Sequence, residues 1–237
     1  MRILPNIEIV DLALYFNSIL VMADVHIGYE EALNKQGIMV PRLQLGEMVK
    51  RMEKIFKLLK NKNIQRIVVN GDLKHEFGAI SEQEWRNTLK FLDLLAKHCK
   101  EVILIKGNHD TILGPIAKKR DVKVLDYFSV GKILVVHGNK VPNNIKNYNT
   151  IIIGHEHPAV SLKEGARVEQ FKCFLKGKYK GKNLIVQPSF NTIIEGTDIL
   201  RDEILSPFLQ QNLDNFDVYI VEDKVYEFGK LKNLRKD

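Results

Sequence analysis

The segment Glu101–Asp110 reads EVILIKGNHD, and it decides the fold class. Its run Val102–Ile105 is apolar, mostly β-branched and without polar alternation, which is typical of a strand buried on both faces of a parallel sheet. Gly107 then allows a sharp turn, so that Asn108 and His109 emerge at the carboxyl end of the strand. Open α/β sheets bind their ligands at this end. The segment therefore predicts an α/β protein with a polar site where its strands end.

Four further strand ends carry polar residues of the same kind. Apolar strands are predicted at Ile19–Ala23 (in a hairpin with Leu12–Phe16, turned at Asn17-Ser18), Arg66–Asn70, Lys132–Val136 and Thr150–Ile153. The residues that follow these four strands are Asp24, His26, Asp72, His137, His155 and His157. Any one of these motifs is equally well explained as a polar turn. Together they favour a common site, because chance would scatter such residues along the elements.

Helices and further strands are predicted around this framework. A helix from Pro41 has an apolar face, and a capping box of Ser81 and Glu84 opens a second helix that runs to about His98. The face of the first helix comprises Leu43, Leu45, Met48, Met52, Ile55, Phe56 and Leu59. The remaining expectations are a loop with a short helical piece over 28–40, a short helix or turn over 111–120, a strand over 123–130 paired with 132–136, antiparallel strands over 159–186 around a lysine-rich loop at 176–182, a short helix over 204–212, and a hairpin of 216–222 with 224–228.

Length and composition set the broad class. The 237 residues, 45% hydrophobic and 27% charged, are typical of a globular chain, and we expect one α/β domain over 1–237. No apolar run reaches the roughly 18 residues that cross a bilayer, and the N-terminus lacks the pattern of a signal peptide. We therefore expect a cytoplasmic protein without a membrane partner. The net charge of +7 favours anionic partners without specifying them.

The donor set indicates a catalytic metal site. Carboxylate, imidazole and amide-oxygen donors without a thiolate suit Mn, Fe or Zn. There are enough donors for two ions if one carboxylate bridges them. Two ions about 3.5–4 Å apart can hold a hydroxide nucleophile and clamp the oxygens of an in-line displacement. Phosphoester hydrolysis needs such charge compensation, because an anion must attack a centre that is already anionic.

The order of these motifs resembles that of a known superfamily. Asp-x-His, Gly-Asp, Gly-Asn-His-Asp, His-Gly and Gly-His-x-His, which span Asp24 to His157, are similar to the five motifs of the calcineurin-like metallophosphoesterases. GDLKHEFG (71–78) and QPSFN (187–191) also resemble the small archaeal and bacterial PdeM-like phosphoesterases, which are related to the core of the SbcD-type break-repair nuclease. The resemblance implies a four-layer αββα sandwich with a dinuclear metal site at the strand ends.

The resemblance also implies roles for single residues. One ion would be held by Asp24, His26, Asp72 and His157, and the other by Asp72, Asn108, His137 and His155, with Asp72 as the bridge. His109 would contact the phosphate or protonate the leaving oxygen, which an imidazole near its ordinary pKa of ~6.5 can do. His75, Lys74 and Asn191 are further candidates for substrate binding. Many relatives carry Asp or Glu where this chain has His75, which leaves open how the substrate side is tuned. Manganese is the expected metal, with iron, zinc or nickel as alternatives.

The leading hypothesis is a dinuclear-metal phosphodiesterase for nucleic acid or nucleotide diesters. The alternatives are a small-nucleotide phosphodiesterase or pyrophosphatase, and a non-catalytic protein-binding scaffold of the same fold. The complete donor set, His109 included, favours an enzyme. Lys176–Lys182 or Lys118–Arg120 could contact nucleic acid, or could simply be solvated lysines. Gly-Asp is not followed by Val-Asp-Arg-Gly, which disfavours phosphoprotein substrates. We leave the oligomeric state open, with a dimer as one candidate.

Overall fold

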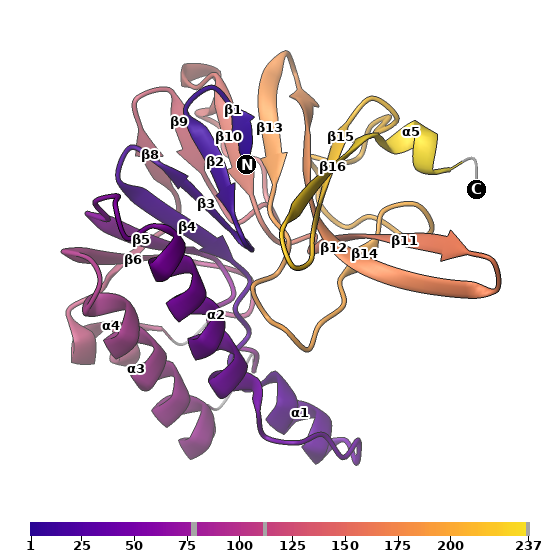
Figure 1. Cartoon of the computed structure of the whole chain (residues 1–237). Helices are drawn as coiled ribbons and strands as arrows, with labels where there is room; N and C mark the ends of the chain where they lie inside the picture. The colour runs from indigo at the N-terminus through magenta and orange to yellow at the C-terminus, as the bar shows by residue number, and fades with distance from the viewer. Residues whose placement is uncertain (77–79, 111–112, 236–237) are drawn as a thin grey trace.

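Two β-sheets pack face to face, and helices cover the outer face of the first (Figure 1). The computed structural model describes residues 1–76, 80–110 and 113–235. None of the helices in these ranges combines the length and the apolar character that crossing a membrane requires.

The first sheet has seven strands in chain order, and its parallel half positions part of the site. Strands β1 to β4 form an antiparallel meander, and β4 to β7 run parallel. The register pairs Ala23 with Asn70 and Asn70 with Ile105, so three strands end level with one another. The strands are β1 (Arg2–Leu4), β2 (Ile7–Val10), β3 (Ala13–Phe16), β4 (Ile19–Ala23), β5 (Arg66–Asn70), β6 (Glu101–Ile105) and β7 (Lys123–Leu125).

The hairpin of β3 and β4 confirms the prediction from the sequence. Phe16 pairs with Ile19, and Asn17 and Ser18 between them have φ of 48° and 60°. Left-handed φ at both positions defines the two-residue turn that matches the twist of a hairpin. The preceding strands, β1 and β2, were not predicted.

Four helices accompany the first sheet. They are α1 (Tyr29–Lys35), α2 (Gln44–Leu58), α3 (Glu82–Ala96) and α4 (Gly114–Arg120). The prediction that α2 begins at Pro41 is wrong. The helix begins at Gln44, whose N–H donates to the Glu30 carboxylate at 2.9 Å, and Leu43 before it is 61% exposed rather than part of the apolar face. The 111–120 prediction falls partly on residues 111 and 112, which lie outside the described residues.

The second sheet supplies the other side of the site. Its path is β14-β11-β12-β13-β10-β9-β8, and β15 and β16 join it at β12. Strands β9, β10 and β13 are parallel, so the segments after them emerge at one end. The strands are β8 (Phe128–Val130), β9 (Ile133–Val135), β10 (Thr150–Ile153), β11 (Pro158–Glu164), β12 (Arg167–Tyr179), β13 (Lys182–Val186), β14 (Thr197–Asp198), β15 (Asp217–Val221) and β16 (Val225–Lys230).

Three predictions in the second half of the chain are corrected. The strand predicted over 123–130 is two strands in different sheets, since β7 pairs with β6 and β8 pairs with β9. The loop predicted over 176–182 is mostly strand, and the chain turns only at Lys180-Gly181. Residues 204–212 form turns without a helix, because Pro207 disfavours the helical conformation in the residue before it.

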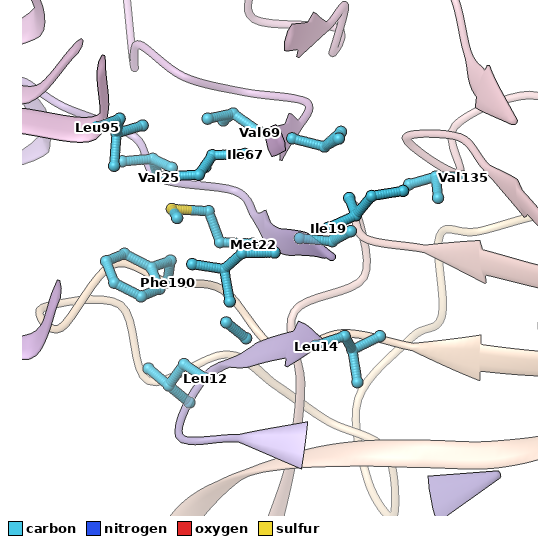
Figure 2. Packing of buried hydrophobic residues seen from close by; sticks show 14 of the residues in the cluster. Leu12, Leu14, Ile19, Met22, Val25, Ile67, Val69, Leu95, Val135 and Phe190 are labelled. Atoms are coloured by element: carbon cyan, nitrogen blue, oxygen red, sulfur yellow. The ribbon is translucent and has the colours of Figure 1, made fainter. Parts of the chain in front are cut away.

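The sandwich has two hydrophobic clusters. One fills the space between the sheets and under α2 and α3, where Figure 2 shows Ile19 of the first sheet on the side that faces Val135 of the second. The other lies on the outer face of the second sheet beneath the segment 199–216, η1 (Ile145–Asn147) and α5 (Leu231–Leu234). The predicted αββα sandwich is confirmed, and its fourth layer consists mainly of irregular chain.

Candidate metal centre

The ends of five strands bring seven of the predicted site residues together. Asp24 and His26 follow β4, Asp72 follows β5, Asn108 follows β6, His137 follows β9, and His155 and His157 follow β10. Asp24, His26, Asp72 and His137 are buried, and the other three are partly exposed. The arrangement is a donor cluster between the two sheets that is open on one side.

The donors fall into two groups with Asp72 between them. In the first group, His157 Nε2 lies 3.3 Å from His26 Nε2 and 3.6 Å from Asp24 Oδ1. The second group comprises Asp72, His137 and His155, whose ligand atoms all lie within 4.8 Å of one another. Asp72 Oδ2 lies 3.7 Å from His26 Nε2 and 3.5 Å from His137 Nε2. Asn108 Oδ1 joins the second group at 2.9 Å from His137 Nε2.

The local backbone is unusual at these donors. Ten non-glycine residues in the described ranges have left-handed φ, and half of them belong to the cluster. These five are Asp24, His26, Asp72, His155 and His157. Such conformations are held only where the surrounding structure fixes them, and they concentrate at functional sites. Two glycines make room for the donors, since a Cβ at Gly107 would lie 2.0 Å from Asp72 Oδ1 and one at Gly71 would lie 2.0 Å from His137 Nδ1.

The electrostatics of the cluster favour the binding of a cation. Burial, and then the nearby Asp24 carboxylate, raise the pKa of Asp72 to about 8, and burial raises the pKa of Asp24 well above its ordinary value. Burial lowers the pKa of His137 and His157 to about 3 and that of His155 to about 4, so these rings are neutral at neutral pH. Asp24 Oδ1 is buried and accepts no hydrogen bond from the described residues. Neutral imidazoles around buried carboxylates fit a divalent cation, whose charge would offset the cost of ionising them.

His109 is oriented by two main-chain contacts. Its own N–H donates to Asp72 Oδ1 at 2.9 Å, and its ring Nδ1 lies 2.6 Å from the carbonyl oxygen of His75. A carbonyl accepts only from a protonated nitrogen, so Nδ1 carries the proton in the neutral ring. The expectation of an ordinary pKa for His109 is wrong. Burial lowers this pKa, and the hydrogen bond to the His75 carbonyl opposes the decrease.

The His75 ring lies at the open side of the cluster. Its centroid is 4.8 Å from that of Tyr29, 5.4 Å from that of His26 and 5.3 Å from that of His109. Its Nδ1 lies 3.4 Å from His26 Nδ1. Burial lowers the pKa of His75 to about 4, so the ring is neutral at neutral pH.

Two predicted substrate contacts have a different place in the structure. Lys74 is fully buried, and its ammonium group donates to the carbonyl oxygen of His109 at 2.8 Å and to that of Glu76. Asn191 is also fully buried, and its Nδ2 donates to the His26 carbonyl oxygen at 3.3 Å. Their polar groups therefore connect the loops of the site, and their contact with a substrate stays a prediction.

Three residues that were not predicted to belong to the site hold the same loops. Asp110 accepts from the N–H groups of Leu73 and Gly107, each at 3.1 Å, and so joins the second and third motifs. Glu84 accepts from the His75 N–H at 3.0 Å. Gln44 donates to the His26 carbonyl oxygen at 2.8 Å. Asp110 could have been predicted, because it is the last residue of the Gly-Asn-His-Asp motif. No local sequence pattern indicates that Gln44 belongs to the site.

Glu84 also corrects the predicted capping box. Ser81 Oγ accepts the Glu84 N–H at 3.0 Å, as a helix N-cap should. The Glu84 carboxylate does not return to the Ser81 N–H, because it accepts from the N–H groups of His75 and Glu76 instead. The first turn of α3 thus supports the loop that carries His75.

The lysine-rich turn lies far from the cluster. Strand β13 runs from Lys182 to Val186 and then enters the segment that contains Asn191, so Lys180-Gly181 lies at its opposite end. Five strand residues correspond to about 16 Å. Lys176 pairs with Asp217 at 3.1 Å, and Lys182 donates to the Tyr148 carbonyl oxygen at 2.6 Å. Lys180 and Lys182, at the turn, therefore do not flank the metal centre.

A two-sheet sandwich with a cluster of Asp and His donors at its strand ends is the structure of a metallophosphoesterase. The chain belongs to the calcineurin-like phosphoesterase family, whose model matches residues 18–214. That range contains every donor of the cluster and His109.

Comparison with solved structures agrees with this fold. The crystal structure of nuclease MPE from Pseudomonas putida superposes with a TM-score of 0.66 at 20% identity, over 93% of this chain and 93% of that one. The phosphoesterase YfcE from E. coli gives a TM-score of 0.42 at 14% identity, over 90% of this chain and 97% of that one. At 20% identity the likeness to nuclease MPE concerns the fold alone. No curated protein matches the sequence significantly.

Proposed function

We propose that this chain is a dinuclear-metal phosphodiesterase that acts on nucleic acid or nucleotide diesters. The observation that carries the proposal is the place of Asp72, a buried carboxylate within 3.7 Å of an imidazole from each donor group. A carboxylate in that position can serve two ions at once. Two ions beside an oriented imidazole are suited to the displacement of an oxygen at phosphorus.

The residues present can hold both ions. Asp24, His26, Asp72 and His157 would hold one, and Asp72, Asn108, His137 and His155 the other. Oxygen and nitrogen donors without a thiolate favour manganese, with iron, zinc or nickel as alternatives. The bound ions would neutralise the anionic substrate and activate water.

His109 supplies the group that a diester with a poor leaving group requires. Its Nδ1–H is held by the His75 carbonyl, so in the protonated ring the other nitrogen has the proton to give. An alkoxide such as a ribose oxygen needs that proton as it departs, and a positioned general acid contributes about 10²–10⁴-fold. The Asp72 carboxylate accepts the main-chain N–H of His109, which keeps the acid next to the metal centre.

Two observations bear on the substrate class. The net charge of +7 and the fold shared with a nuclease from Pseudomonas putida support nucleic acid. The location of Lys180-Gly181 at the far end of β13 favours the second candidate, a phosphodiesterase or pyrophosphatase for small nucleotides, since no lysine of that turn can guide a strand to the site.

One assay tests the proposal. The metal-reconstituted protein is incubated with bis-p-nitrophenyl phosphate, a phosphomonoester, cyclic nucleotides, and single- and double-stranded DNA. We expect diesters to be hydrolysed faster than the monoester, and activity to disappear in chelator. Full activity in chelator, or a preference for the monoester, would contradict the proposal.

A further inference from the structure

His75 serves the site with two different groups. Its carbonyl oxygen lies 2.6 Å from His109 Nδ1, while its ring Nδ1 lies 3.4 Å from His26 Nδ1. The main chain of His75 is fixed, because its N–H donates to the Ile27 carbonyl oxygen at 3.0 Å and to Glu84 Oε1 at 3.0 Å. Since a carbonyl already holds His109, the His75 imidazole is available for His26.

The two nitrogens of His26 face different surroundings. Nε2 is directed into the donor cluster, 3.3 Å from His157 Nε2 and 3.7 Å from Asp72 Oδ2. Nδ1 is directed away from the cluster, and within the described ranges His75 Nδ1 is its only hydrogen-bond partner. A neutral imidazole binds a cation through the nitrogen that has no proton, so a ligating Nε2 requires the proton on Nδ1. His26 is buried, and a buried N–H needs an acceptor.

We propose that His75 is a positioning residue, whose Nδ1 accepts the Nδ1–H of His26 and holds His26 in the tautomer that presents Nε2 to a metal ion. The inference rests on the proposed function in taking His26 as a ligand. Partners of this kind orient metal-binding histidines, and their loss typically lowers metal affinity about 10–100-fold. The acceptor ring is itself held in place, since Tyr29 contacts it edge-on at 4.8 Å between centroids.

Two variants separate the acceptor from the ring. His75→Phe keeps the aromatic contact with Tyr29 and removes the acceptor, whereas His75→Asn supplies an amide oxygen close to the position of Nδ1. In the metal-free protein labelled with ¹⁵N-histidine, we expect the His26 proton on Nδ1 in the wild type and in His75→Asn. In His75→Phe we expect it to shift toward Nε2, the nitrogen that free imidazole side chains prefer to protonate. His98, which stacks on Phe56, is the control for an intact fold.

Metal binding gives the second readout. Titration with Mn²⁺ should show affinity for the first ion lowered about 10–100-fold in His75→Phe and restored to within a few-fold of wild type in His75→Asn. Wild-type affinity in His75→Phe, or a His26 proton on Nε2 in the wild type, would overturn the inference. Complete loss of one bound ion in both His75 variants, with unchanged affinity for the other ion, would overturn it too, because His75 would then be a ligand. If the protein hydrolyses no phosphodiester but the tautomer result holds, the proposed function fails and the inference stands.

Discussion

Replacing Gly107 by alanine should disrupt the metal centre through a single methyl group. A Cβ at this position would lie 2.0 Å from Asp72 Oδ1 and 2.3 Å from the Asp72 main-chain nitrogen, where ordinary contact begins at 3.4 Å. The nitrogen cannot yield as a side chain would, because β5 before it is paired with β4 on one side and β6 on the other. The displacement therefore falls on the Asp72 carboxylate, which would bridge the two ions.

The loss of stability in this variant can be estimated from the clash. Overpacking a closely packed site destabilises a protein by about 1–3 kcal/mol. For a chain of this length, 1 kcal/mol shifts Tm by about 2–4 °C, so Tm should fall by about 2–12 °C. Thermal unfolding in chelator measures this effect without a contribution from bound metal. Elemental analysis of the reconstituted variant should find fewer ions per chain, and bis-p-nitrophenyl phosphate should be hydrolysed far more slowly.

Gly46→Ala is the matched control. Gly46 is exposed within α2, has no left-handed φ, and would place its Cβ in open space. Removing a glycine from a helix stabilises it by about 0.5–1 kcal/mol, so this variant should unfold slightly later than wild type and bind both ions. Gly107 also lacks a left-handed φ, so its requirement is one of space alone. A Gly107→Ala protein with wild-type Tm and metal content would refute the reasoning.

Four further outcomes are expected. Asp72→Asn should weaken both metal sites and abolish hydrolysis with an unchanged circular dichroism spectrum, and an active variant would refute its bridging role. His109→Ala should keep both ions and lose about 10²–10⁴-fold on a nucleotide diester but far less on bis-p-nitrophenyl phosphate, whose leaving group needs no proton. Equal losses would point to charge stabilisation instead. In chelator, the urea midpoint should be highest at about pH 7. As the pH falls below this, six site histidines with lowered pKa take up protons only when unfolded, which outweighs the opposite effect of Asp72. Asp72 is ionised only when unfolded at every pH between its ordinary pKa and about 8, and above pH 7 its effect dominates, so stability falls on both sides. A flat profile from pH 5 to 8 would contradict this. Replacing Lys178, Lys180 and Lys182 by glutamine should leave hydrolysis of small diesters unchanged, and a large loss would mean that the turn reaches the site.

The strands and their polar ends could be predicted because both signals are local. A buried strand such as Ile103–Ile105 is recognised by the lack of alternating polar residues. The residues that follow such a strand lie at the ligand-binding edge of the sheet, independently of the rest of the fold. The structure brings the seven predicted donors together, and their role as ligands stays a prediction. The αββα sandwich came from the resemblance, because no local pattern specifies how two sheets stack.

The rest could not be predicted because it depends on partners distant in the sequence. Gln44 supports His26 across 18 positions, and Glu84 uses its carboxylate on His75 although its sequence pattern is that of a cap. The group that orients the His109 ring is a main-chain carbonyl, so no pattern of side chains in the sequence predicts this contact. The stretch Lys176–Lys182 was misinterpreted for a different reason. Its alternation of lysine with Gly177 and Tyr179 is the period of a strand, and its composition suggested a loop.

The buried residues that contact the donor loops stabilise backbone conformations that are unfavourable for the donors themselves. Five donors sit in left-handed conformations that cost of order 1–3 kcal/mol each, although aspartate tolerates this region better than histidine does. That strain is balanced by contacts such as those of Gln44 with His26 and of Asp110 with Leu73. The buried residues behind the donors constrain the chemistry as strictly as the donors do, because a donor is useful only in the conformation that they maintain.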